Sequence, residues 1–164
     1  MVIIAGQRIL ASDMLVEHDA NGHHVLGPLW FTPQESTGTR SVHDRYFGVL
    51  LDLATEYALF NVRIPDYFVS LSKARVIIIP TTAGTIDWTC QTAAGAAGED
   101  ESQAVDSATA DGAGVVDDQL TAIDVSGAFN GLSLAPGDLV GVKFILDALA
   151  TTTQVFVIGL ELGY

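Results

Sequence analysis

Apolar and polar residues alternate along most of the chain from residue 46 onward, and helical periodicity is nearly absent. The clearest run is YALFNVRI at 57–64, in which Ala58, Phe60, Val62 and Ile64 share one face. A period of two places successive side chains on opposite faces of a β-strand. Pro65 ends the run, because proline has no N–H to donate to a neighbouring strand. The pattern therefore predicts a strand with one buried face.

Six further segments have the same character, and turns rich in Gly and Pro separate them. They are residues 48–53, 71–79, 85–92, 118–125, 137–147 and 154–164. Short strands at regular spacing indicate an antiparallel sandwich, and roughly eight strands with one long excursion fit a jelly roll. We therefore predict an all-β fold, an antiparallel jelly-roll-like β-sandwich with an extended N-terminal arm and hairpin. Its predicted core includes Phe60, Val62, Ile64, Val76, Ile78, Trp88, Val142, Phe144, Phe156 and Ile158.

Residues 92–117 interrupt this pattern, since they consist mainly of Ala, Gly, Ser and acidic residues. A segment with so few large apolar side chains cannot bury enough surface to form a core of its own. It predicts the end of a strand, then a long exposed loop with one short strand around Ala104–Ser107.

Residues 1–45 differ from the rest, so we divide the chain into an N-terminal arm and hairpin appendage (1–45) and a jelly-roll domain (46–164). The opening MVIIAGQRILASDML is apolar and lies outside the sandwich pattern. An apolar arm without a core to enter is best satisfied by another chain, often by adding a strand to the edge of a neighbour's sheet. The predicted partner-binding residues of the arm are Val2, Ile3, Ile4, Arg8, Ile9, Leu10 and Leu15.

The hairpin segment VEHDANGHHVLGP contains three of the four histidines. Asn21-Gly22 favours a two-residue turn, because both residues tolerate positive φ. A turn closed there pairs Asp19 with His24 and places His18 and His23 together on the opposite face. This register disfavours a single-chain metal site of three histidines and favours a surface pair of Asp19 with His24. A metal shared between symmetry-related chains stays open.

Composition and charge exclude some partners. The chain has 164 residues, 49% apolar and 16% charged, which is typical of a folded domain. Its 20 acidic and 7 basic residues give a net charge of −13, which argues against binding nucleic acid or anionic membranes. Residues 76–164 carry one basic residue, Lys143. No secretion signal or membrane-length apolar run is found, so we expect synthesis in the cytoplasm.

Candidate chemistry is sparse. A cluster of acidic side chains is the first candidate for a metal site: Glu99, Asp100, Glu101, Asp106, Asp111, Asp117 and Asp118. Calcium prefers such oxygen ligands, but the spacing matches no EF-hand loop, so a solvated acidic loop is favoured. Cys90, the single cysteine, alternates with Trp88 on the predicted core face, which indicates a buried thiol rather than a nucleophile. Without a nucleophile elbow or a phosphate-binding loop, we predict no enzyme activity, no cofactor and no metal.

Two parts of the chain resemble known viral proteins. AGQRILASDML (5–15) resembles a short adaptor segment of phage tail and appendage proteins, of the form Ala-Gly, two variable residues, Leu-Thr-Ala, one variable residue, Asp-Leu. It departs from that form in the Leu-Thr pair and in Met14, which precedes the final leucine. Residues 54–164 resemble jelly-roll-like β-sandwich modules of phage and virus structural proteins. The segments that carry this resemblance are FNVRIPDYF (60–68), IDWTC (86–90), LAPGDLVGVKF (134–144) and VFVIGLELGY (155–164).

The resemblance implies a virion structural protein. Our main hypothesis is a capsid decoration (cement) protein, a homotrimer at the virion surface after assembly in the host cytoplasm, whose arm docks on the major capsid protein or another virion subunit. The alternative is a tail or head-fibre module that binds a host receptor or glycan. A third hypothesis is a jelly-roll lectin or glycan-active enzyme, for which Trp30, Tyr46 and Tyr67 are the candidate exposed aromatic residues.

Overall fold

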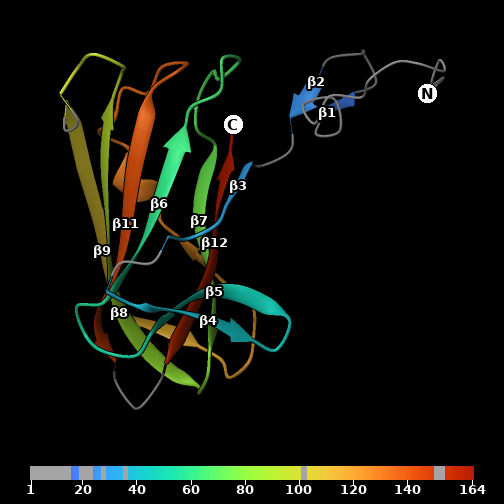
Figure 1. Ribbon diagram of the computed structural model, residues 1–164, viewed down its shortest axis with the longest axis vertical. Coiled ribbons are helices and arrows are strands. Elements are labelled where there is room, and N and C mark those ends of the chain that lie inside the picture. Colours follow the sequence, from blue (N-terminus) through green and yellow to red (C-terminus); the bar gives the residue numbers. More distant parts are fainter. Residues whose placement is uncertain (1–15, 19–23, 27–28, 35–36, 101–102, 150–153) are drawn as a thin grey trace.

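A computed structural model describes residues 16–18, 24–26, 29–34, 37–100, 103–149 and 154–164. Within these residues the chain forms β-strands and one short 3-10 helix, and the strands of two antiparallel sheets pack face to face (Figure 1). The predicted all-β antiparallel sandwich is confirmed. None of these described elements is a helix long and apolar enough to cross a membrane.

Eight strands form a jelly roll. They are β5 (Tyr46–Leu51), β6 (Tyr57–Arg63), β7 (Lys73–Pro80), β8 (Gly84–Gly95), β9 (Ala104–Val115), β10 (Thr121–Asp124), β11 (Leu139–Leu149) and β12 (Val155–Gly163). β5 pairs with β12, β6 with β11, β7 with β10 and β8 with β9, all antiparallel. The chain is thus one long hairpin whose two arms roll up together, which gives the strand orders β5-β12-β7-β10 and β6-β11-β8-β9. This is the topology of a jelly roll.

Two more strands extend the first sheet to six. β4 (Thr39–His43) pairs with β5, and β3 (Leu29–Phe31) pairs with β12. β12 pairs with β5 as far as Val157 and with β3 from Leu160 onward, so β3 replaces β5 as its neighbour. β3 and β4 lie in the range 1–45 that we assigned to the appendage, so the six-stranded sheet extends into that range.

The predicted hairpin near the N-terminus exists, but its register is different. β1 (Val16–His18) pairs antiparallel with β2 (His24–Leu26), and His18 is directly opposite His24. Our prediction of Asp19 opposite His24 is therefore wrong by one position. Residues 19–23, which include the predicted turn at Asn21-Gly22, lie outside the described residues.

The predicted strand around Ala104–Ser107 exists but is much longer, so the prediction of a long loop over most of 92–117 is wrong. β8 continues to Gly95, and β9 runs for 12 residues from Ala104 to Val115 and pairs along its length with β8. Four of its inward positions are alanines, Ala104, Ala108, Ala110 and Ala113, which pack against the core. Alanine gives a weak alternation signal because its side chain is small and buries little apolar surface, although it fits a pleated surface next to larger residues.

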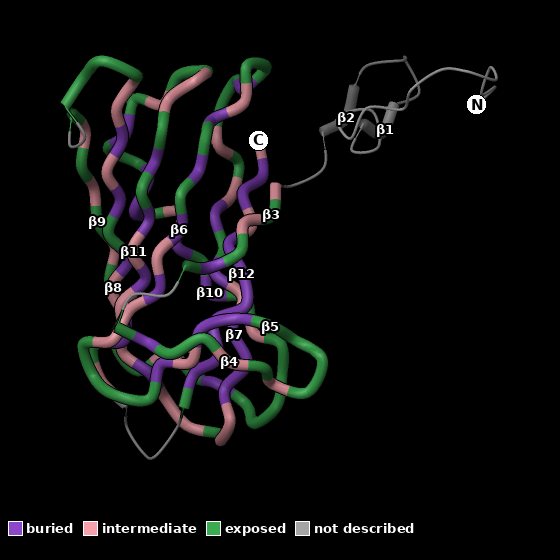
Figure 2. The backbone as a smooth tube through the Cα atoms, in the orientation of Figure 1, coloured by how far each residue is buried: buried purple, intermediate pink, exposed green. Residues whose placement is uncertain are grey.

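The core lies between the two sheets, and all ten predicted core residues are buried. Trp88 and Phe144 stack at its centre with ring centroids 5.9 Å apart. Buried positions alternate with intermediate or exposed ones along β8 and β11 (Figure 2). Phe156 and Ile158 instead join Ile79 in a second, smaller cluster. The 3-10 helix η2 (Ser126–Phe129) adds Phe129 and further buried surface beside β9.

Candidate binding groove on the four-stranded sheet

The four-stranded sheet β6-β11-β8-β9 has an outward face, on which side chains point away from the core. In one row across the strands, Asn61, Gly141, Ala93 and Val105 are neighbours. Because adjacent strands lie about 4.8 Å apart, the row is roughly 14 Å long. Gly141 and Ala93 have the smallest side chains of this row, so its middle is low.

The next row along the same face is more polar. It consists of Leu59, Lys143, Gln91 and Ser107, which are again successive neighbours across the four strands. Gln91 and Ser107 are exposed, whereas Leu59 and Lys143 are half-buried. Alternation within each strand turns these side chains to the solvent side, because their sequence neighbours point into the core.

Two hollows lie over these rows and share Asn61, Ala93 and Gly141. One has a volume of about 750 Å³ and extends toward Arg63, Leu139 and residues 95–100. The other has a volume of about 650 Å³ and extends over the polar row. Since they share lining residues, we treat them as one feature, the sheet groove. Each of the two hollows is within the size range of small-molecule binding sites.

Hydrogen bonds within the protein fix the charged groups at the first end of the groove. Arg63 Nη2 donates to Asp66 Oδ1 at 2.9 Å, and both side chains are largely exposed. Glu99 Oε2 accepts from the backbone N–H of Ala96 at 2.9 Å. Glu99 and Asp100 contribute the acidic groups of this end.

Lys143 is the cation of the second end. Its Nζ lies 4.0 Å from the ring centroid of Tyr57, a cation–π contact that holds the ammonium over the sheet face. Among the ion pairs of the described residues, none involves Lys143.

Asp106 is the acidic residue that lines the same end, and its carboxylate is engaged elsewhere. Its two oxygens accept from the backbone N–H groups of Ser107, at 2.8 Å, and Gly131, at 2.6 Å. Asp106 is opposite the buried Thr92, so it belongs to the inward-pointing positions of β9, whereas Ser107 points outward. Among the described residues that line this end, Lys143 therefore has no competing carboxylate on its own side.

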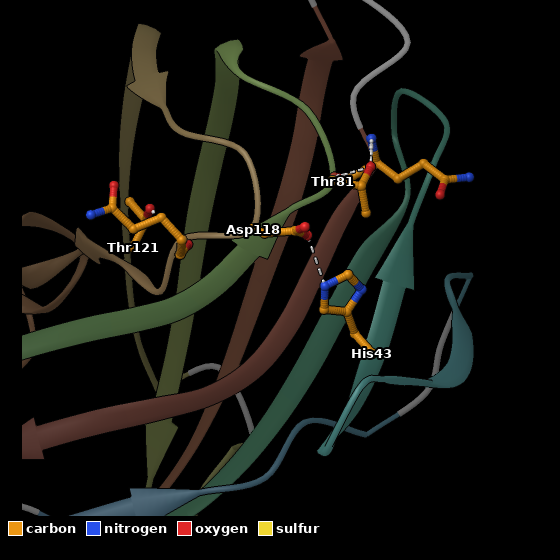
Figure 3. Close-up of polar contacts among 6 residues, drawn as sticks. His43, Thr81, Asp118 and Thr121 are labelled. Atoms are coloured by element: carbon orange, nitrogen blue, oxygen red, sulfur yellow. Dashed lines mark hydrogen bonds and ion pairs between the residues drawn. The ribbon is translucent and has the colours of Figure 1, made fainter.

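A second polar cluster joins β4 to the β9–β10 connection. His43 Nε2 and Asp118 Oδ1 are 3.0 Å apart (Figure 3). The His43 ring lies 5.9 Å from that of Phe156. Asp118 has a φ of 51°, and its N–H donates to the carbonyl of Pro80 at 2.9 Å. Within the described residues, His43 has no other side-chain hydrogen bond, so the pair fastens an edge strand to a turn and no hydroxyl or thiol is activated by it.

The acidic residues predicted as a solvated loop are dispersed by the structure. Asp106 and Asp111 belong to β9, Asp118 pairs with His43, and Glu101 lies outside the described residues. In the part of the chain that the structure describes, no three His, Cys, Asp or Glu side chains form a group able to hold a metal ion.

The arm and one histidine of the hairpin are also outside the described residues. This applies to the predicted partner-binding residues of the arm, Val2, Ile3, Ile4, Arg8, Ile9, Leu10 and Leu15, and to Asp19 and His23. Their roles stay predictions.

The three candidate aromatic residues are exposed but lie on separate elements. Trp30 is on β3, where its indole fills the space beside Gly159. Tyr46 begins β5. Tyr67 is in the β6–β7 connection, and its ring lies 5.9 Å from that of Tyr164. None of the three lines the sheet groove.

Sequence reasoning missed the residues that do line it. Asn61, Gln91 and Lys143 each stood at an outward position of a predicted strand, so alternation already placed them on the solvent side. The sequence did not indicate the strand order. That order places Leu59 and Lys143, which are more than 80 positions apart, next to each other in one row.

Cys90 is buried, as predicted, and burial raises the pKa of its thiol from 9.0 to about 12. At pH 8 the thiolate fraction is therefore expected to be ~1000-fold lower in the folded than in the unfolded protein. Iodoacetamide labelling, followed by mass spectrometry, should be correspondingly slower in buffer than in urea. Between pH 9 and 12 the unfolded rate should level off while the folded rate still rises. Equal labelling rates in the two states at pH 8 would contradict the burial.

Comparisons with known proteins give no family. No protein-family model matches the chain, and no match among curated proteins was found. Among solved structures, the chain is similar to a CBM36 carbohydrate-binding module in complex with calcium and xylotriose, with a TM-score of 0.46 and 15% identity over 81% of this chain and 93% of the module. It is also similar to the CBM36-1 domain of a multidomain xylanase from the hindgut metagenome of Trinervitermes trinervoides, with a TM-score of 0.39 and 10% identity over 82% of this chain and 90% of that domain. These values assign no site or ligand to this chain.

Proposed function

We propose that the protein is a glycan-binding β-sandwich module, the lectin form of our third hypothesis, and that the sheet groove is its binding site. The observation that carries the proposal is the groove itself, which crosses four rigid strands and has amide, hydroxyl and cationic side chains at its sides. A site built on strands keeps its geometry without the ligand, which lowers the entropic cost of binding.

The lining groups suit a ligand with many hydroxyls. A sugar hydroxyl both donates and accepts, and the side-chain amides of Asn61 and Gln91 offer both functions. Ser107 adds a hydroxyl. The low floor at Ala93 and Gly141 leaves space for the thickness of a sugar ring, and the junction of the two hollows allows a chain of several units to lie along the face.

The capsid-decoration role and the homotrimer stay predictions. The comparisons do not support a relationship to phage or virus proteins, and the arm that would dock lies outside the described residues. The predicted lack of enzyme activity also stays a prediction.

The groove can be filled without disturbing the fold. No atom lies within 4 Å of the position that a Cβ at residue 141 would take, other than those of its chain neighbours, and the backbone there is not in the left-handed region. The Cβ of Gly141→Leu therefore has free space, and the rest of the side chain extends into the groove. Gly114 on β9 has the same open surroundings but does not line the groove, so Gly114→Leu is the matched control.

Affinity gel electrophoresis against xylan, galactomannan, hydroxyethylcellulose, polygalacturonate and chondroitin sulfate tests the proposal. We expect retardation by at least one glycan, a loss of affinity of about tenfold or more in Gly141→Leu, and no loss in Gly114→Leu. Both variants should melt at or above the wild-type temperature, because glycine weakens a strand. The absence of retardation by every glycan, or equal retardation of wild type and Gly141→Leu, would overturn the proposal.

A further inference from the structure

We infer that the ligand of the sheet groove is an anionic glycan, whose carboxylate or sulfate group lies beside Lys143. The inference rests on the proposed function and specifies the ligand class of the same site.

The first argument is the distribution of charge. The chain carries a net charge of −13, and Lys143 is the single basic residue between positions 76 and 164. That one cation stands on the face of the sheet, in the middle of the polar row, between Leu59 and Gln91. A cation that only increased solubility would be of little use in a chain whose charge is already far from zero.

The second argument is that the ammonium group of Lys143 is held in place by an aromatic ring but is not neutralised by a carboxylate among the described residues. The Tyr57 ring holds its Nζ at 4.0 Å, and no carboxylate pairs with it among the described residues. Two other cations differ in this respect, because Arg63 pairs with Asp66 and Lys73 pairs with Glu161. An ammonium without a carboxylate, half-buried in a groove, is a suitable partner for an external anion.

The third argument concerns the ends of the groove. Glu99 and Asp100 line the far end, near Arg63, and the carboxylate of Asp106 is turned to the inner side of the sheet by its hydrogen bonds to backbone N–H groups. An anionic group is therefore attracted to the Lys143 end and disfavoured at the Glu99 end. The two ends of the groove therefore differ in charge, and this difference should orient a glycan whose acidic groups are unevenly spaced.

The chain's overall negative charge opposes long polyanions at low ionic strength. At physiological ionic strength the Debye length is about 8 Å, so the field of distant carboxylates is largely screened while a direct contact with Lys143 is not. Short oligosaccharides at 0.15 M salt are therefore the appropriate probes.

Isothermal titration calorimetry with tetragalacturonate, a chondroitin sulfate tetrasaccharide and neutral xylotetraose tests the inference. We expect tighter binding of at least one of the two anionic probes than of the neutral one, and the better of the two distinguishes carboxylate from sulfate. Lys143→Gln should weaken binding of that probe by about tenfold or more, because a hydrogen bond to a charged group is lost, and should weaken binding of the neutral probe by a smaller factor. Lys143→Arg should retain most of the affinity, because it keeps the charge.

Arg75→Gln is the matched control, since Arg75 is an exposed cation on a strand of the other sheet and its loss changes the net charge equally. Equal weakening in Arg75→Gln and Lys143→Gln would show a general charge effect and overturn the inference. Preferential binding of xylotetraose that Gly141→Leu abolishes and Lys143→Gln leaves intact would also overturn it, while the proposed function would stand. If no glycan bound, the proposed function itself would fail.

Discussion

Phe60→Ala is expected to lower the free energy of unfolding by roughly 3–5 kcal/mol. Phe60 is fully buried on β6, in the cluster that fills the space between the two sheets. Its removal takes away the transfer free energy of the ring and leaves a cavity that strands on both sides cannot close, because their hydrogen-bond ladders fix their spacing. For a domain of this size, the loss corresponds to a decrease in Tm of roughly 6–20 °C.

Urea unfolding followed by far-UV circular dichroism measures this effect. Phe47→Ala is the matched control, because Phe47 is 56% exposed at the start of β5. It should cost less than about 1 kcal/mol. An unchanged m-value in both variants would show that stability, rather than the compactness of the unfolded state, has changed. If the two substitutions cost the same, Phe60 would not belong to the core.

Gly48→Ala is expected to destabilise the protein by about 1–3 kcal/mol or more, although alanine is the better strand residue. Gly48 is the position on β5 next to the last residue that pairs with β12. A Cβ there would overlap the carbonyl oxygen of Val157 and lie 3.0 Å from its carbonyl carbon. Relief requires movement of the β12 backbone where it turns from β5 to β3, since no rotamer change moves a carbonyl group.

Gly114→Ala separates this steric effect from the general effect of replacing a glycine in a strand. No atom lies near the Cβ position at Gly114, so this substitution should be neutral or stabilise by up to about 1 kcal/mol. Differential scanning calorimetry of the two variants gives the comparison. A Gly48→Ala protein as stable as Gly114→Ala would mean that β5 and β12 do not approach as closely as described.

For the proposed binding site, the sequence indicated which residues face solvent, but it did not indicate which of them become neighbours on the sheet. Asn61, Gln91 and Lys143 each stand at an outward position of a strand that alternation predicts. The rows that bring them together depend on β11 lying between β6 and β8. The two-residue alternation determines on which face of its own strand a side chain lies. It carries no information about which strand is the neighbour.

The sequence by itself determined the fold class and most of the core, because strongly apolar residues at every second position leave a strand one way to bury them. It also determined that Cys90 is buried beside Trp88. Only the tertiary structure decided that the Ala-rich segment forms β9, that β3 and β4 join the six-stranded sheet, and that His18 faces His24 in register. These three features depend on pairing with a partner strand, and the free energy of pairing lies in contacts and hydrogen bonds between segments rather than in the residues of either segment alone.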